Sequence, residues 1–506
     1  MRNAALILAC ITSSVLHAQI WLDTGFGTGG VVSTSLNANY DGAFALERQP
    51  DGKLVIAGVS GQAASYDILI ARYNTDGSLD TEFGTNGSII LDLGMSDQCL
   101  GMALGADGSI MAVGTTTGVP SGTDSWVARF TPDGTLDLGF NGTGYIRIND
   151  SLQEDKLSAV SVRPDGKVLV AGRGFTSSKQ CFYILQYNSD GTLDTDFGTA
   201  GSVKHLIGID NCEATCLEVM ADGSFFCAGT SYTDVTSKND LVVTKYSATG
   251  VLDVDFSSDG KAVIIPSNNQ DKGYGLAVQP DGKILVGGVE NEVNSAAKII
   301  VARLLANGSI DTGFGTDGIA RPFTGDFPSR CEDIAVADDG KILACGTSTL
   351  NAQGRNSFLC RLNSTGALDA AFGTGGILEY GQIGLYRETP GMVLQPDGKV
   401  VLAGLTGSAP NNNVLLLRYL SSPTTGITEQ GALDFRLIAA AANELRIESE
   451  AAIGNIQVFD AAGKLITEAS ASGTSGIRTI ALRSPLLPGA YVLRTKWSAL
   501  RFAIGE

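Results

Sequence analysis

Short runs of β-branched and apolar residues alternate with turn residues over positions 22–420 of the chain. In the first unit, four segments have the length and composition of β-strands: residues 30–33, 43–46, 54–58 and 67–73. Tight turns follow the second and the fourth segment, at residues 50–53 and 74–77; in the first of them Pro fixes φ, and in both Asp and Gly suit the turn positions. No helical periodicity interrupts this pattern. The pattern therefore predicts an antiparallel sheet of short strands.

This unit recurs with a period of about 58 residues. A phrase that matches or nearly matches Leu-Asp-x-x-Phe-Gly marks the copies, and it begins at Leu22, Leu79, Leu136, Leu193, Leu252, Ile310 and Leu368. A second marker is an Asp-Gly turn, formed by Asp51, Gly52, Asp107, Gly108, Asp165, Gly166, Asp222, Gly223, Asp281, Gly282, Asp339, Gly340, Asp397 and Gly398. Asp and Gly are residues that tight turns require. We therefore predict that these residues are structural and take no part in chemistry.

A single sheet of this kind has two apolar faces, which it can bury only against copies of itself. Seven copies arranged radially give an all-β, seven-bladed β-propeller with four-stranded antiparallel blades. The array begins with one strand and ends after the third strand of the last unit, at residues 414–420. Residues 30–34 should therefore complete the seventh blade. A β-solenoid is the alternative, but it needs shorter rungs than these units provide.

Three phrases resemble the delta-60 repeat family of bacterial secreted proteins. They are Gln-Pro-Asp-Gly-Lys at residues 49–53, Ala-Arg-Tyr-Asn at residues 71–74 and Leu-Asp-Thr-Glu-Phe-Gly at residues 79–84. The resemblance extends over residues 22–420. It implies a propeller-like repeat and no particular activity.

The pattern changes after Leu420. Residues 421–430 have the composition of a linker, and residues 431–506 contain short alternating strands typical of a small β-sandwich. Residues 458–466 and 487–492 resemble the C-terminal sorting domain of type IX secretion cargo from Bacteroidetes. That resemblance implies the type IX machinery as a partner. An accessory sandwich that caps the propeller is the alternative.

The first residues are typical of a secretory signal peptide. Arg2 and an apolar stretch at residues 4–15 precede the small residue Ala18, which predicts a signal at residues 1–18 and cleavage before Gln19. Lipid modification of Cys10 is the alternative. No later segment is long and apolar enough to predict a transmembrane helix. We expect the protein to be secreted or held at the outer cell surface.

Charge and histidine content limit the chemistry of the chain. It has 53 acidic and 35 basic residues, and a net charge of −18 argues against nucleic-acid partners, since phosphate binding needs clustered Lys and Arg. The two histidines are His17, inside the predicted signal, and His205. Histidine-dependent nucleophilic catalysis would rest on His205 alone, and zinc sites with two histidines are excluded after cleavage. His205 lies in a predicted strand, which favours a structural role.

Nine cysteines are present, one of them inside the predicted signal. Export permits disulfides. Cys216 and Cys227 flank one Asp-Gly turn, and Cys331 and Cys345 flank another, so each pair is a candidate bridge between hairpin strands. Buried free thiols are the alternative.

Two motifs suggest cofactors. Residues 25–30 satisfy a dinucleotide-binding glycine pattern, but a strand follows where that chemistry needs a helix N-terminus. Residues 74–80 and 188–194 resemble part of a calcium loop. Arg72 and Gln186 occupy the place of the first carboxylate ligand, which favours an Asx turn over calcium. We predict no metal or other cofactor, with calcium as the alternative.

Carboxylate chemistry remains open. Asp155, Glu213, Asp271, Glu332 and Asp333 fall near one end of the predicted innermost strands, where they can gather at one opening of the propeller. Most other acids belong to repeating turns. We therefore predict no catalytic residue and favour a binding or adhesion scaffold for a glycan or protein. A carboxylate-dependent enzyme acting on extracellular polysaccharide is the alternative, and a passive envelope component is the third interpretation.

Overall fold

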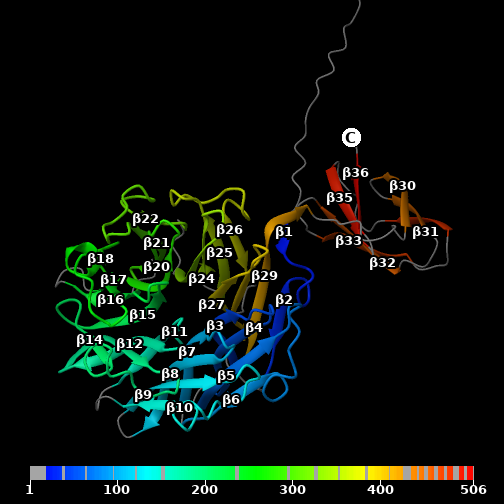
Figure 1. The fold of residues 1–506 in the computed structure, drawn as a ribbon. Helices are drawn as coiled ribbons and strands as arrows, with labels where there is room; N and C mark the ends of the chain where they lie inside the picture. The colour runs from blue at the N-terminus through cyan, green and yellow to red at the C-terminus, as the bar shows by residue number, and fades with distance from the viewer. Residues whose placement is uncertain are drawn as a thin grey trace, which may run out of the picture. The chain divides into compact units, whose positions relative to one another are not determined.

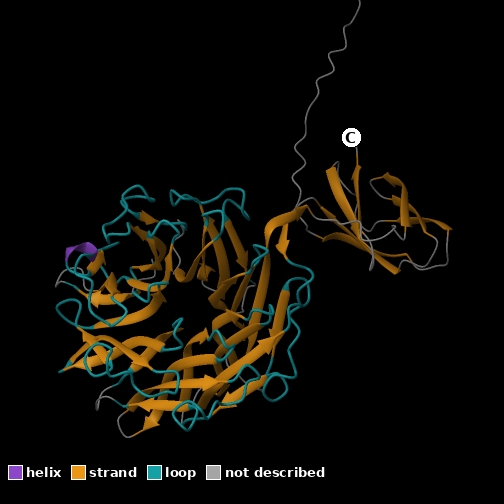
Figure 2. Ribbon diagram, viewed as in Figure 1, coloured by secondary structure: helices purple, strands orange, loops and turns teal. Residues whose placement is uncertain are grey.

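The fold is that of a computed structural model. It describes residues 19–36, 40–62, 65–94, 96–119, 122–149, 154–233, 239–292, 297–323, 329–351, 354–381, 386–408 and 411–425, together with the strands β30 to β36 given below. Among these residues the elements are strands, apart from one turn of 3-10 helix, η1 (Phe256–Ser258) (Figure 2). The predicted signal, including Ala18, lies outside the described residues, and Gln19 opens β1 (Gln19–Leu22).

Consecutive strands form antiparallel four-stranded sheets, as the repeat predicts (Figure 1). The first three sheets contain β3 (Tyr40–Arg48), β4 (Leu54–Gln62), β5 (Ser65–Tyr73) and β6 (Ser88–Leu91); β7 (Ser96–Leu104), β8 (Ile110–Val119), β9 (Gly122–Phe130) and β10 (Tyr145–Ile148); and β11 (Lys156–Val162), β12 (Val168–Thr176), β13 (Lys179–Tyr187) and β14 (Ser202–His205). The next three contain β15 (Cys212–Val219), β16 (Phe225–Tyr232), β17 (Asn239–Tyr246) and β18 (Lys261–Ile264); β19 (Lys272–Val278), β20 (Ile284–Glu290), β21 (Lys298–Leu304) and β22 (Ile319–Ala320); and β23 (Ser329–Val336), β24 (Ile342–Asn351), β25 (Gly354–Leu362) and β26 (Ile377–Tyr380).

The last sheet of the array joins its two ends. It contains β27 (Tyr386–Leu394), β28 (Val400–Ser408) and β29 (Asn411–Thr425), and its fourth strand is β2 (Val31–Thr34). Val31 pairs with Leu417 and Thr34 with Val414, so the N-terminal strand completes the last unit, as the sequence predicts. The first strand of each sheet contacts the first strand of the next, and β27 contacts β3, which closes the series.

Adjacent sheets bury each other's apolar faces. One core cluster joins Val55 and Ile70 of the β3–β6 sheet to Ile110 and Ala128 of the following sheet, all fully buried. Within each sheet, the first strand has a bulge where it pairs with the second strand. At Gly58 a Cβ would lie 2.0 Å from the carbonyl oxygen of Gly42, so the neighbouring strand leaves room for glycine alone.

A repeated guanidinium group links each sheet to the next. Arg72 makes an ion pair with Asp80 at 2.6 Å, stacks over the Phe83 ring and donates to the carbonyl of Pro132 in the next sheet. The same donation to the following sheet is made by Arg129, Arg303, Arg361 and Arg418. We call this arrangement the arginine clamp. The strand-end arginine of the repeat is thus a structural residue that crosses the boundary between sheets.

The third unit keeps the clamp although its strand ends in Gln186. Arg163, which comes from the preceding turn, is buried and donates to the Gln186 side chain and to the carbonyl of Ala248. Ala248 occupies the turn position that Pro132 holds two units earlier. A guanidinium from a different place in the chain therefore reaches the equivalent acceptor.

The antiparallel order gives the array two rims. The turn rim carries the connections from first to second strand and from third to fourth strand in each sheet. The loop rim carries the connections from second to third strand and from each sheet to the next. First strands begin at the loop rim and end at the turn rim.

Residues 22–421 form one compact unit, and the flanking segments form another. The C-terminal part contains β30 (Phe435–Ala441), β31 (Glu444–Ser449), β32 (Gly454–Asp460), β33 (Leu465–Ala471), β34 (Gly476–Ala481), β35 (Gly489–Arg494) and β36 (Ala499–Ile504). They form two antiparallel sheets, ordered β30-β31-β34 and β33-β32-β35-β36. In the described part of the chain, no helix is long and apolar enough to cross a membrane.

Candidate functional site

The turn rim holds the Asp-Gly residues that the sequence singled out. In every repeat the aspartate Oδ1 accepts a hydrogen bond from the backbone N–H two residues later, at 2.9–3.2 Å. The glycine that follows has a φ between 78° and 92°, a region that other residues rarely adopt. These aspartates therefore act as local acceptors in Asx turns.

The calcium-like loops also form Asx turns. Asp76 Oδ1 accepts from the backbone N–H and hydroxyl of Ser78, and Asp190 accepts in the same way from Thr192. Asp80, the last acid of the first loop, is held by Arg72 and Lys53 at 2.6 and 2.8 Å. Hydrogen bonds and positive charge thus occupy the oxygens that a cation would need.

The described cysteines are free thiols in this structure. The register of the two hairpins places Cys216 opposite Ala228 and Cys331 opposite Gly346, so neither cysteine lies directly opposite its candidate partner. Neither candidate pair, Cys216 with Cys227 or Cys331 with Cys345, is bridged here. Burial raises the pKa of the Cys216 thiol to about 12, so this sulfur is a weak nucleophile.

His205 ends β14 and has a structural environment. Its Nδ1 lies 3.1 Å from the hydroxyl of Tyr246, and the two rings meet edge to face. Burial lowers the pKa of His205, and the Lys261 charge lowers it further. Both observations favour a neutral imidazole that packs against its neighbour.

The five acids that the sequence placed near one opening have separate partners. Asp271 is fully buried and accepts from Ser267 and the backbone of Asn291, and Glu213 pairs with Lys156 at 2.6 Å. Asp155 is fully buried at the start of its strand. Glu332 and Asp333 enter the two groups described next. A gathering of all five at one opening stays a prediction.

The first group lies at the loop rim, and we call it the rim cluster: Lys272, Tyr274, Glu292, Arg330 and Glu332. Glu292 accepts from the Tyr274 hydroxyl at 2.6 Å and pairs with Lys272 at 2.7 Å. Arg330 lies over the Tyr274 ring, 5.3 Å from its centre, and approaches Glu292 and Glu332 at 3.5 and 3.8 Å. These residues bring two sheets together through charge and aromatic contact.

The two acids of the rim cluster, Glu292 and Glu332, have pKa values shifted in opposite directions. Burial alone would raise the pKa of Glu292, but hydrogen bonds from Lys272 and Tyr274 lower it below its ordinary value. Burial raises the pKa of Glu332 to about 7 against the opposing charge of Arg330, and the Glu388 charge raises it further. The cluster thus holds one firmly ionised carboxylate and one that titrates near neutrality.

The second group consists of Glu47, Glu218 and Asp333, which we call the inner acids. They lie on the first strands β3, β15 and β23, which belong to three different sheets. Burial raises the pKa of Glu47 to about 7, with contributions from the charges of Asp333 and Glu218. Burial likewise raises the pKa of Asp333 to about 7, although the backbone N–H groups of Ile334 and Met392 donate to it.

Sequence reasoning missed most of both groups. For the rim cluster the signal was a departure from the repeat at the bulge of the first strand. Tyr274 and Glu332 stand there, where the first three units have Phe44, Leu100 and Ser158. The repeat motifs in the sequence do not reveal this departure, because the position of the bulge is known only from the pairing of the strands.

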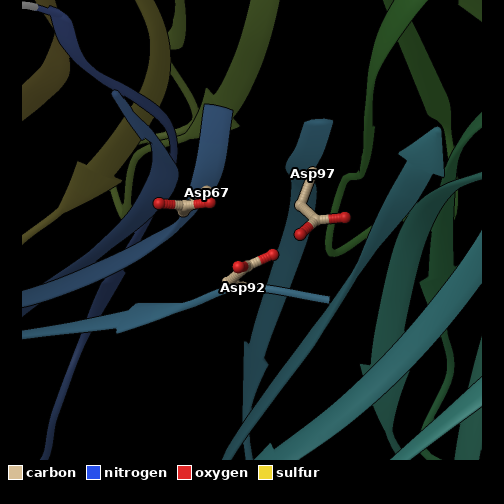
Figure 3. Close-up of side chains that lie close together, drawn as sticks. All are labelled: Asp67, Asp92 and Asp97. Carbon is tan, nitrogen blue, oxygen red and sulfur yellow. The ribbon is translucent and has the colours of Figure 1, made fainter. Parts of the chain in front are cut away.

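A third group, the carboxylate trio, lies at the loop rim between the first two sheets (Figure 3). Asp67 lies in β5 just before its apolar residues, Asp92 follows β6, and Asp97 lies near the start of β7. One oxygen from each carboxylate lies within 4.8 Å of one oxygen from each of the others. Asp97 is fully buried, whereas Asp92 is exposed. Oxygen atoms so arranged are the ligands that hard cations prefer.

Comparison with known proteins identifies the architecture. A family model described as a domain of unknown function (DUF5122) β-propeller matches residues 49–83, 105–140, 163–197, 279–314, 337–372 and 395–422. No curated protein matches the chain.

Solved structures similar to the chain have low sequence identity. The polysaccharide lyase Uly1 is 12% identical with a TM-score of 0.45, covering 78% of this chain and 93% of that one. Sqt1 from Chaetomium thermophilum is 12% identical with a TM-score of 0.42, covering 75% and 95%. A protein of unknown function from Dyadobacter fermentans is 10% identical with a TM-score of 0.40, covering 77% and 98%. With the repeated sheets and the family match, we conclude that the chain is a β-propeller repeat protein.

Proposed function

We propose that residues 22–420 form a seven-bladed propeller that acts without catalysis and binds a glycan or a protein at its loop rim. The observation that carries this proposal is the rim cluster. Tyr274 and Glu332 occupy the bulge position where the first three units have Phe44, Leu100 and Ser158, so the repeat does not require their polar groups for folding.

The rim cluster has the properties of a prepared binding surface. Tyr and Arg contribute large contact areas and directional hydrogen bonds, and they are enriched where proteins bind their partners. The contacts among Tyr274, Glu292 and Arg330 fix these side chains before a ligand arrives. The Arg330 side chain remains 45% exposed, so its guanidinium can still reach a ligand.

A glycan array with the purified full chain tests this proposal. We expect binding that Arg330→Ala reduces at least about tenfold, the loss of one charged hydrogen bond. Lys283→Ala is the matched control, because Lys283 is a partly exposed cation on the turn rim. Equal binding by wild type and Arg330→Ala would contradict the assignment of this surface. If no glycan binds, a peptide array with the same variants tests the protein ligand.

The alternative, a carboxylate-dependent enzyme on extracellular polysaccharide, is favoured by one observation. Glu47 and Asp333 have pKa values raised to about 7, which suits proton transfer near neutral pH. Incubation of the full chain with a panel of polysaccharides, followed by a reducing-end assay, tests this function. Activity that Glu47→Gln abolishes would favour the enzyme over the scaffold.

We also propose that the protein is exported to the outer surface or the medium. In this proposal residues 1–18 are a signal cut between Ala18 and Gln19, residues 421–430 are a linker, and residues 431–506 are a sandwich recognised by type IX machinery. The two sheets after the linker support it. Deleting residues 431–506 should leave the protein in the periplasm of a type IX-competent host. Unchanged export after the deletion would contradict the sorting role.

A further inference from the structure

The carboxylate trio differs from the group of residues at the same positions where the array closes. In the junction that closes the array, Asp41 occupies the position of Asp97. Both oxygens of Asp41 are satisfied: Oδ2 accepts from the backbone N–H of Leu36 and Oδ1 from the hydroxyl of Ser60, each at 2.7 Å. The side chain there completes a loop and needs no further partner.

Asp97 makes only the first of these bonds. Its Oδ2 accepts from the backbone N–H of Leu93, but the buried Oδ1 has no hydrogen-bond partner among the described residues. Thr116 lies opposite Asp97 at the position of Ser60, and within the same described part of the chain its buried Oγ1 also has no partner. An unpaired buried carboxylate oxygen costs about 1–3 kcal/mol unless something satisfies it.

Additional negative charge gathers beside this incomplete site. Asp67 and Asp92 correspond in the closing junction to Asn413 and Ser35, which are uncharged. Among the described residues, no Lys or Arg forms an ion pair with any member of the trio. Burial raises the pKa of Asp67, and the charges of Asp92 and Asp97 raise it further. The three carboxylates therefore repel one another where the equivalent site has no such charge.

We propose that Asp67, Asp92 and Asp97 bind a divalent cation, and that calcium is the ion whose chemistry fits. Figure 3 shows the carboxylates of Asp92 and Asp97 turned toward each other, with Asp67 beside them. Calcium accepts six to eight oxygen ligands in irregular geometry, whereas magnesium demands a near-ideal octahedron. Exposed Asp92 leaves one side open, so water can complete the coordination.

The position of the trio gives the ion a defined role. Asp67 and Asp92 belong to the β3–β6 sheet, while Asp97 belongs to the next sheet. A cation here joins two sheets at the loop rim, as the arginine clamp joins them at the turn rim. This inference is independent of the proposed ligand at the rim cluster, which lies on other sheets.

Thermal unfolding of the full chain tests the proposal. After treatment with a chelator, addition of millimolar calcium should raise the melting temperature by about 2 °C or more, because an ion that binds only the folded state stabilises it. Titration calorimetry should show one site per chain. An unchanged melting temperature together with no binding heat would overturn the proposal. A magnesium response equal to that of calcium would overturn the choice of ion.

Asp92→Asn is the informative variant, because its side-chain oxygen can still accept from the backbone N–H of Gly94. Without calcium it should melt above the wild type, since repulsion is relieved, and it should lose the calcium response. Asp76→Asn is the control, because Asp76 is also exposed and accepts a backbone N–H in a loop that resembles a calcium motif. An equal calcium response in wild type and Asp92→Asn would contradict the assignment to the trio.

Discussion

The two rims are built from the same strands but use their acidic residues differently. On the turn rim the Asp-Gly aspartates bond to a backbone N–H in each repeat, and Asp80 is neutralised by Arg72 and Lys53. On the loop rim no second group like the carboxylate trio is found among the described residues, and the rim cluster breaks the repeat at the bulge. Residues that recur therefore maintain the fold, whereas residues that depart from the repeat are those for which we propose a binding role.

The largest effect should come from the turn rim. Phe314 is fully buried beneath the guanidinium of Arg303, whose carbon lies 4.3 Å from the ring centre. Phe314→Ala should lower the free energy of unfolding by about 3–5 kcal/mol, because it leaves a cavity and removes the surface on which the clamp rests. Denaturant unfolding followed by fluorescence measures this. If Phe314→Ala lowered the free energy of unfolding by less than a loop-rim substitution does, the difference that we draw between the two rims would be contradicted.

The clamp at Arg163 offers the next largest effect. Arg163→Gln should cost about 2–3 kcal/mol, because the carbonyls of Gly223 and Ala248 lose charged donors. Adding Gln186→Arg should restore much of the loss, since the other clamp arginines stand at the equivalent position. A double variant no more stable than Arg163→Gln would show that the two places are not interchangeable. Melting temperatures of the three chains provide the measurement.

The inner acids should make stability depend on pH. A carboxyl whose folded pKa is raised favours the folded state at low pH and loses that contribution as pH rises through the folded value. For Glu47 this stabilising contribution is lost as the pH rises from the ordinary pKa range of a glutamate to the folded-state pKa of about 7. Glu47→Gln should therefore melt higher than the wild type at pH 8 and show a flatter profile between pH 5 and 8. Parallel profiles for the two chains would contradict the raised pKa.

The smallest effect on stability should come from the rim cluster. Tyr274→Phe keeps the ring beneath Arg330 and removes only the hydroxyl that donates to Glu292. We expect a loss of about 1 kcal/mol or less, together with a clear loss of ligand binding. The roles given to the two rims would be reversed by two results together. Tyr274→Phe would still bind the ligand, and Phe314→Ala would weaken ligand binding by more than its loss of stability accounts for.

Sequence periodicity identified the strands but underestimated their length. The predicted strand at residues 43–46 is the centre of β3 (Tyr40–Arg48), and the predicted strand at 54–58 is the start of β4 (Leu54–Gln62). Both extend toward the loop rim, where polar residues such as Asp41 and Ser60 still pair through their backbones. The pattern of apolar residues indicates which part of a strand is buried. The backbone hydrogen bonds between strands extend further, because backbone groups outside the buried part also need partners.

The sites were harder to predict for a related reason. Asp67 and Asp97 belong to different repeats, and their proximity depends on how one sheet packs on the next. The candidate disulfide between Cys216 and Cys227 is not formed here, and the register of the hairpin places Cys216 opposite Ala228, which the spacing in the sequence does not reveal. By contrast, the turn residues could be assigned directly, since each acts within four positions of itself.

The pairing of β2 with β29 fixes the order in which the array can be completed. The last sheet draws Val31 from near the start of the chain and Leu417 from the far end of the repeats, so a growing chain cannot finish the ring until the final repeat has been synthesised. Until then β3 lacks β27 as a neighbour and presents an unprotected apolar flank. A circular permutant that begins at Tyr40 and joins residues 22–34 behind the last repeat would make every sheet continuous in sequence and should shorten this exposed interval.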